Sequence, residues 1–182
     1  MEEKDIHNEV WLAPWDAEWA QIFELEKQFI ISILSDNGHN AHVYHVGGTS
    51  IEGMASKPII DILVCPDTGI RLEECIPDLE KIGYKNLGDC GRPGRYFLTS
   101  GDKPGDTFYL HLCYENHQVA QDQLLFQKIL RDSAELRSKY LYTKHLLEGE
   151  FPDDRSMYRE MKGLFISGVL GGYRLSHTKN KG

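Results

Sequence analysis

Residues that can bind phosphate and metal ions stand close together between positions 45 and 61. The stretch contains the adjacent glycines Gly47 and Gly48, which let the backbone turn sharply and approach a ligand closely. Amide N–H groups exposed in such a turn can point at phosphate oxygens, and the hydroxyls of Thr49 and Ser50 add donors beside them. This pattern predicts a turn that binds a phosphate group.

Lys57 and Asp61 follow the turn and add the two charges that phosphate chemistry uses. A lysine ammonium suits an anion as a point charge. Asp61 lies inside the apolar run 58–64, "PIIDILV", where an acid needs a partner. A divalent cation is one such partner, and Lys57 or an arginine is another. A tight turn with Asp61 in a structural ion pair accounts for the same residues, so both interpretations stay open at this point.

Two short strands and the turn between them would position these residues. The run 41–46, "AHVYHV", is rich in strand-forming residues, and the run 58–64 is bounded by prolines, as a buried strand would be. Two more strands are predicted in "RYFLTS" and "FYLHLCYE", joined by a polar connection with glycine and proline. Helices are predicted after an N-cap at Asp16 and over residues 68–82, 117–131, 134–148 and 154–170.

The order of these elements predicts an α/β (α+β) fold, in which a mixed β-sheet core is flanked by helices. The pattern changes near residue 117, where a helical C-terminal part begins. We therefore expect one domain over residues 1–182, with its core in about 1–116 and its C-terminal helices in about 117–175.

Composition limits the partners and the compartment. The 182 residues carry a formal net charge of −8, which disfavours a broad basic face for duplex nucleic acid but allows a local basic pocket for one small anion. The four cysteines form no C-x-x-C pair, which favours a reducing compartment. The polar N-terminus and the lack of a long apolar stretch disfavour a signal peptide and a membrane span. We expect a cytoplasmic protein with no membrane partner.

The central stretch resembles a known sequence motif. "HVGGTS" followed by "DILV" is similar to the nucleotidyltransferase-fold motif, in which h-G-[GS] precedes D-h-[DE]-h. The longer "YHVGGTSIEGMASKPIIDILV" resembles the GrpB family, whose members carry a stretch like H-I-G-S-T-A-V-P-G-L-A-A-K-P-I-I-D-I. "WLAPWDAEWAQIFELE", "GRPGRYF", "YLHLCYEN" and the helices after them are similar to further segments of that family. The resemblance implies a nucleotidyltransferase-like fold and leaves the substrate open.

Departures from the full motif bear on the metal. Asp61 and Leu63 share one strand face, and the full motif has a second acid where this chain has Leu63. One carboxylate is a poor magnesium site unless substrate phosphates and waters supply the other ligands. A third acid usually comes from a neighbouring strand, and here His111 takes the inward position of "FYLHLCYE". A histidine suits zinc, manganese or a general base better than magnesium. Gly48 also stands where the family has serine.

Other charged side chains are weaker candidates. Arg95 precedes a strand and could bind a phosphate with both guanidinium N–H pairs, or be solvated. His39, His42 and His45 recur every three residues, which suggests zinc. Side chains of a strand alternate between its faces, so His42 and His45 would point apart and a shared zinc site is disfavoured.

Two hypotheses of different class follow. In the first, the chain is an enzyme that transfers a nucleotidyl or phosphoryl group to a small molecule. The glycine turn holds the phosphates, Asp61 binds Mg²⁺ or Mn²⁺, Lys57 and Arg95 neutralise charge, and His111 is a metal ligand or base. In the second, the chain binds a nucleotide or another phosphate-bearing small molecule and has lost catalysis, because Leu63 replaces the second acid.

Overall fold

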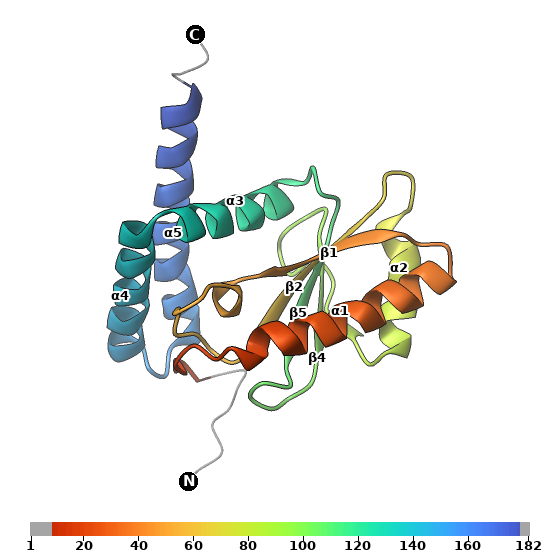
Figure 1. The fold of residues 1–182 in the computed structure, drawn as a ribbon, viewed down its shortest axis with the longest axis horizontal. Helices are drawn as coiled ribbons and strands as arrows, with labels where there is room; N and C mark the ends of the chain where they lie inside the picture. Colours follow the sequence, from red (N-terminus) through yellow and green to blue (C-terminus); the bar gives the residue numbers. More distant parts are fainter. Residues whose placement is uncertain (1–8, 179–182) are drawn as a thin grey trace.

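The computed structural model describes residues 9–178 and shows a sheet with helices against both of its faces (Figure 1). The first half of the chain contains α1 (Glu18–Asp36), β1 (Ala41–Val46), the 3₁₀ turn η1 (Gly48–Ser50), β2 (Ile60–Pro66) and α2 (Leu72–Lys81). The second half contains β3 (Lys85–Asn86), β4 (Tyr96–Ser100), β5 (Phe108–Leu112), α3 (Gln118–Asp132), α4 (Ala134–Glu150) and α5 (Arg155–Thr178).

The sheet is mixed, as the sequence predicts. Its strand order is β1-β2-β5-β4-β3; β2 and β5 run parallel, and every other neighbouring pair is antiparallel. The register pairs Asp61 with Tyr109 and Leu63 with His111. The predicted site residues of β2 and β5 therefore stand on neighbouring central strands and on the same face.

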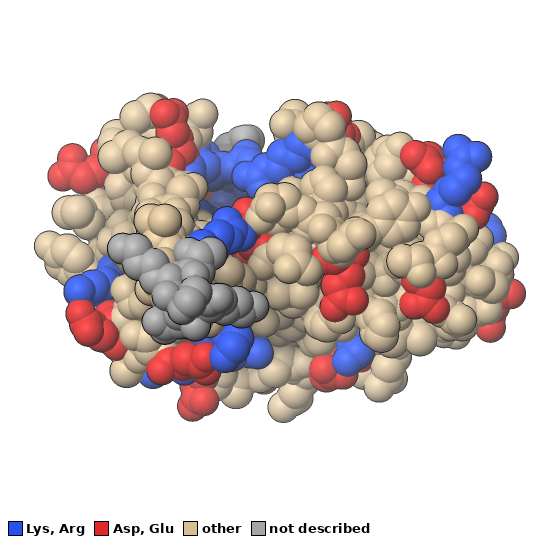
Figure 2. All heavy atoms as spheres, turned by 90° about the horizontal axis from the view of Figure 1, so that it is seen from above, with Lys and Arg blue, Asp and Glu red and all other residues tan. Residues whose placement is uncertain are grey.

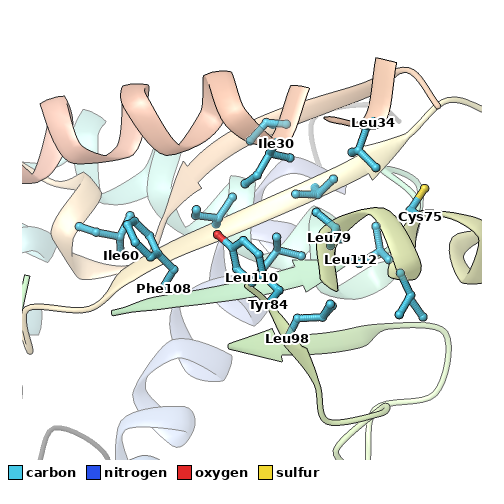
Figure 3. Packing of buried hydrophobic residues seen from close by; sticks show 14 of the residues in the cluster. Ile30, Leu34, Ile60, Cys75, Leu79, Tyr84, Leu98, Phe108, Leu110 and Leu112 are labelled. Carbon is cyan, nitrogen blue, oxygen red and sulfur yellow. The ribbon is translucent and has the colours of Figure 1, made fainter. Parts of the chain in front are cut away.

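Helices α1 and α2 cover one face of this sheet and form the main core with it (Figure 3). Apolar side chains of α1 recur at helical spacing and are buried. Alternate residues of β2 meet them from below, because strand side chains alternate between the two faces. The buried members of this cluster that Figure 3 labels include Ile30, Leu34, Ile60, Leu79, Leu98, Leu110 and Leu112.

The opposite face is only partly covered. Helix α3 packs on the carboxyl ends of β2 and β5, where Leu63, Cys65 and Cys113 form a second apolar cluster with Ala120. His117 starts α3, because its Nδ1 accepts the N–H of Val119. The other end of this face carries Asp61 and lies beside the C-terminal helices α4 and α5. A polar site is thus left between the sheet and these helices.

Several boundaries differ from the prediction. The expected helix 68–82 begins later, at Leu72, and contains Pro77. The last helix continues through two glycines to Thr178, where Tyr173 stacks on His177 at 3.9 Å and Arg174 pairs with Asp122 of α3. The two-residue strand β3 carries too little pattern to be predicted. Within residues 9–178, no helix combines the length and the hydropathy that crossing a bilayer requires.

Candidate functional site

The glycine turn lies directly against the carboxylate of Asp61. Strand pairing places Asp61 opposite Val46, the last residue of β1. Gly47 then turns with φ 73°, a conformation that residues with a β-carbon rarely adopt. A β-carbon at Gly47 would lie 2.9 Å from Cβ and Cγ of Asp61 and closer still to Oδ2. The bare backbone of Gly47 therefore contacts Asp61, whose side chain is 31% exposed.

The two hydroxyls of the turn are used inside the protein. Ser50 Oγ donates to the Gly47 carbonyl at 2.7 Å, and Thr49 Oγ1 donates to the Ile59 carbonyl at 3.3 Å. Gln127 of α3 donates through Nε2 to the His45 carbonyl and to Ser50 Oγ, both at 2.6 Å. Thr49 and Ser50 thus hold the shape of the turn, and Gln127 fixes it to α3.

His45 supports the turn from the α1 side, and within residues 9–178 it has no companions with which it could hold a zinc ion. Its ring stacks on Phe23 with centroids 4.6 Å apart, and its Nε2 lies 3.0 Å from Thr49 Oγ1. Burial lowers the pKa of His45 to about 4, so its imidazole is neutral near pH 7. His42 is exposed, and His39 pairs with Asp78 instead. The three histidines do not converge, as the strand argument predicts.

The neutral state of His45 gives a testable pH dependence. The unfolded chain protonates this imidazole near pH 6.5 and the folded chain only near pH 4, so stability falls as pH drops through this interval. We expect the free energy of unfolding to fall less steeply with decreasing pH in His45→Gln than in the wild type, by up to about 1.4 kcal/mol per pH unit. Urea unfolding of both proteins at pH 4.5 and pH 7 measures it. Equal pH slopes in the two proteins would contradict a neutral, buried His45.

His111 is held by Arg95 on one side and faces Asp61 on the other. Arg95 Nη1 lies 3.0 Å from His111 Nδ1, and since a guanidinium only donates, Nδ1 accepts. A neutral His111 then carries its proton on Nε2, which lies 3.9 Å from Asp61 Oδ1. Burial lowers the pKa of His111, and the charges of Arg95 and Arg92 add to this against the opposing effect of Asp61. In this arrangement Nε2 is a donor. To bind a metal or act as a base, as predicted, His111 would need a lone pair on Nε2 and its proton on Nδ1, and Arg95 would then have to move away from Nδ1.

Arg95 itself is buried, with only 5% of its surface exposed. Nη2 donates to the Asp89 carbonyl at 2.8 Å, while Nε has no hydrogen-bond partner in the described part of the chain. Burial lowers the pKa of Arg95, and Arg92 and Arg159 add to this. The Lys57 ammonium donates to the Glu9 carbonyl at 2.7 Å. The phosphate contacts predicted for Arg95 and Lys57 stay predictions.

Two lysines of the C-terminal helices also lie at this site. Lys144 of α4 is 4% exposed and donates to the Ala55 carbonyl and, at 2.7 Å, to Ser56 Oγ. Burial lowers the pKa of Lys144 to about 7, helped by Lys162 and opposed by Asp61. Burial also lowers the pKa of Lys162 of α5, and Asp61 opposes this shift too. Each ammonium lies over the ring of the tyrosine four residues before it, and this repeated Tyr-x-x-x-Lys spacing is the signal in the sequence.

Basic side chains from three parts of the chain therefore surround Asp61 and His111. We call them the basic cluster; its members are Arg92, Arg95, Lys144, Arg155, Arg159 and Lys162. Figure 2 shows Lys and Arg gathered in a hollow of the surface between the C-terminal helices and the sheet part. Arg155 also donates to the Tyr109 hydroxyl at 3.1 Å, which joins α5 to β5. The chain is acidic overall, yet this site is basic.

A cavity of about 420 Å³ lies at the edge strand β1, away from the basic cluster. It opens between α1 and α3, behind the glycine turn, and its walls include Trp15, Phe23, His45 and Arg131. Its lining contains neither Asp61 nor any member of the basic cluster. This cavity and the basic cluster are therefore separate features of the molecule.

Comparison with known proteins agrees with the fold and the motif. A family profile described as "GrpB protein" matches residues 9–171 of the chain. The chain belongs to the GrpB family. This confirms the resemblance seen in the central stretch.

Relatives of this GrpB chain cover most of its length. It is 39% identical over 165 residues to UPF0157 protein BH1888 of Halalkalibacterium halodurans, with 90% of this chain and 83% of that protein covered. It is 32% identical over 161 residues to UPF0157 protein PA4798 of Pseudomonas aeruginosa, with 87% of this chain covered. The chain spans 65% of the length of PA4798 and 43% of the length of UPF0157 protein YqkA of Bacillus subtilis.

Solved structures place the GrpB chain in a wider fold class. Conserved protein GrpB from Enterococcus faecalis matches with a TM-score of 0.69 and 26% identity, covering 88% of this chain and 99% of that one. Cid1 poly(U) polymerase, as an H336N mutant bound to MgATP, matches with a TM-score of 0.55 and 15% identity, covering 75% of this chain and 44% of that one. The fold of the GrpB chain is therefore nucleotidyltransferase-like.

The side chains of this GrpB site do not fit a two-metal centre. Such a centre needs several carboxylates that converge on the ions. Leu63 is fully buried at the second acid position, and within residues 9–178 no group of three or more His, Cys, Asp and Glu side chains could hold a metal ion. Asp61 and His111 remain, with the basic cluster around them. The donor set therefore consists of Asp61, His111 and the basic cluster.

Proposed function

We propose that the chain binds a phosphate-bearing small molecule of the nucleotide class between the glycine turn and helices α4 and α5, without a divalent cation between the phosphates and the protein. The observation that carries this proposal is the basic cluster. Burial lowers the pKa of Lys144 and of Lys162, and neighbouring cations add to it: Lys162 in the case of Lys144, and Arg159 and Arg155 in the case of Lys162. Asp61 offsets these shifts only in part, so the cluster favours a further counter-anion. A bound phosphate supplies that anion, and it does so where water is partly excluded.

The acids near the cluster leave this charge uncompensated. Asp61 lies on β2 against Gly47 and opposes the lowered pKa of both lysines. Glu148 faces Lys144 from its own helix, but its Oε1 already accepts the N–H of Leu12 at 2.7 Å. The orphan Nε of Arg95 is a further donor without an acceptor in the described residues. Several donors near Asp61 and His111 are therefore left for an anion.

A second candidate is transfer of a nucleotidyl or phosphoryl group to a small molecule. One specific observation favours it: Asp61 stands against the glycine turn, where an acid that handles the reacting phosphate would be needed. The fold is shared with Cid1, whose structure is bound to MgATP. The donor set described above supports no step routed through metal ions, so the binding function is the better supported proposal. The reducing cytoplasm belongs to the same proposal, since all four cysteines are free thiols.

Calorimetry with ATP, with and without Mg²⁺, tests the proposal and separates the two candidates. We expect binding without Mg²⁺ and no nucleotide turnover. Asp61→Asn should tighten this binding about two- to fivefold, because it removes a negative charge beside the phosphates. If the chain is instead a transferase that uses Asp61, the same substitution abolishes turnover. Binding that requires Mg²⁺ and is lost in Asp61→Asn would overturn the proposal.

A further inference from the structure

Gly48 needs to be glycine because of its neighbours and not because of its conformation. Unlike Gly47, it does not have a φ in the left-handed region. A β-carbon at Gly48 would lie 3.0 Å from Lys144 Nζ and closer still to Ser56 Oγ. The hydroxyl of Ser56 therefore fills the space in which a side chain of residue 48 would begin.

The backbone of Ser56 is fixed independently of its side chain. Ser56 forms an antiparallel bridge with Ala13, with N–H to carbonyl distances of 2.9 Å in both directions. Its Oγ donates to the Met54 carbonyl at 3.2 Å and accepts from Lys144 Nζ at 2.7 Å. Ser56 is 4% exposed, so this hydroxyl serves the interior of the site and not the solvent.

Lys144 needs this hydroxyl to keep its place. An ammonium has three N–H donors, and in the described structure the Ala55 carbonyl and Ser56 Oγ accept two of them. One N–H is left for a ligand. The charges that face Lys144 are Lys162 of α5, Asp61 of β2 and Glu148 of α4.

A serine side chain at residue 48 would overlap the hydroxyl of Ser56, so the site has room for only one of the two. This chain supplies it from residue 56.

We infer that Ser56 is a positioning residue of the proposed anion site: its hydroxyl takes the place of a side chain at residue 48 and holds the Lys144 ammonium toward the phosphate of the ligand. The inference rests on the proposed function for its ligand. It adds a residue that the glycine turn and Asp61 alone do not reveal, and it names Lys144 as the group through which Ser56 acts.

Moving the hydroxyl tests this inference. Ser56→Ala should weaken ATP binding about tenfold, because the ammonium loses a charge-assisted hydrogen bond. Gly48→Ser should weaken binding at least as much and lower the unfolding temperature, because two side chains then compete for one space. In the double variant Gly48→Ser with Ser56→Ala, the ATP affinity should return to within about threefold of the wild-type value. Its unfolding temperature should return close to that of the wild type. Gly149→Ser, which adds the same side chain to α4 where nothing lies within 4 Å, should change neither.

A second readout follows Lys144 directly. In protein labelled with ¹³C-lysine, NMR titration should show a lower pKa for Lys144 in Ser56→Ala, since the charged form loses an acceptor, and a restored pKa in the double variant. Wild-type affinity in Ser56→Ala, or a double variant that regains stability but neither affinity nor the Lys144 pKa, would overturn the inference. If the wild type binds no ATP, the proposed function fails. The titration still decides whether Ser56 positions Lys144, and an unchanged pKa in Ser56→Ala then refutes this too.

Discussion

Replacing Gly47 by alanine is expected to lower the free energy of unfolding by about 3 kcal/mol and to abolish anion binding. Two costs add. A β-carbon at φ 73° costs roughly 1–2 kcal/mol on its own. The new methyl group also overlaps the Asp61 side chain, and overpacking of this kind costs roughly 1–3 kcal/mol. Because Val46 and Asp61 are paired across β1 and β2, the overlap can be relieved only by distorting the turn that faces the ligand.

Gly88→Ala is a matched control for this prediction. Gly88 has the same φ of 73°, but nothing lies within 4 Å of a β-carbon built on it. It should lose only the conformational part, about 1–2 kcal/mol, and keep full affinity for ATP. Urea unfolding and calorimetry on both variants measure the difference. Equal losses of stability in the two variants would mean that the contact between Gly47 and Asp61 contributes nothing.

Lys144→Met is expected to reduce ATP affinity by more than about tenfold. The substitution keeps the length of the side chain but removes the ammonium, and a hydrogen bond to a charged group loses this much when it is broken. Lys139→Met removes an exposed ammonium from the same helix, where it pairs only with Glu135 on the surface, and should leave the affinity unchanged. Comparable losses in the two variants would show that general charge, and not the position of Lys144, governs binding.

The same substitution should change how stability and affinity depend on pH. The pKa of Lys144 lies near 7 in the folded chain and near 10.4 in an unfolded one, so the unfolded chain binds more protons between these values. The stability of the wild type relative to Lys144→Met should therefore rise with pH from 7 to 10, by up to about 1.4 kcal/mol per unit. Conversely, ATP favours the charged lysine, so wild-type affinity should fall above pH 7 and binding at pH 8 should take up a proton. A variant that shows the same proton uptake as the wild type would exclude Lys144 as its source.

The local sequence pattern predicted several of the strands and helices of the fold. The run "AHVYHV" corresponds to β1 without a shift, because strand-forming residues act over a few positions. The predicted strand 58–64 corresponds to β2 but begins and ends two residues too early. Asp16 was predicted as the N-cap of the first helix, but the N-cap of α1 is Ala17; Asp16 lies one residue earlier and accepts the Glu18 N–H at 2.9 Å. The resemblance to a family suggested that the strand of His111 neighbours that of Asp61, but the parallel direction of β2 and β5 was not predicted and periodicity alone does not give it.

The chemistry of the site was harder to predict because it depends on distant residues. Lys144 and Lys162 look like surface lysines on amphipathic helices until α4 and α5 are placed against the turn. Gln127 is similarly ordinary in sequence, yet it fixes the turn through two hydrogen bonds. For Lys57, proximity in sequence suggested a place beside the phosphate, and this stays a prediction; in the structure its ammonium donates to the Glu9 carbonyl. Spacing along the chain predicts neighbours only within one element.

The contact of Lys144 with the loop also bears on how the protein folds. The hydrogen bond from Lys144 to the Ala55 carbonyl joins residues 89 positions apart, and the one from Leu12 to Glu148 joins residues 136 apart. Contacts of such long range form after local structure, because closing large loops costs chain entropy before the contacts compensate for it. On a ribosome, the site cannot assemble until α4 has left the exit tunnel and packed on the loop. A bound phosphate ligand would then slow the reopening of the last helices, which makes hydrogen exchange in α4 a measure of occupancy.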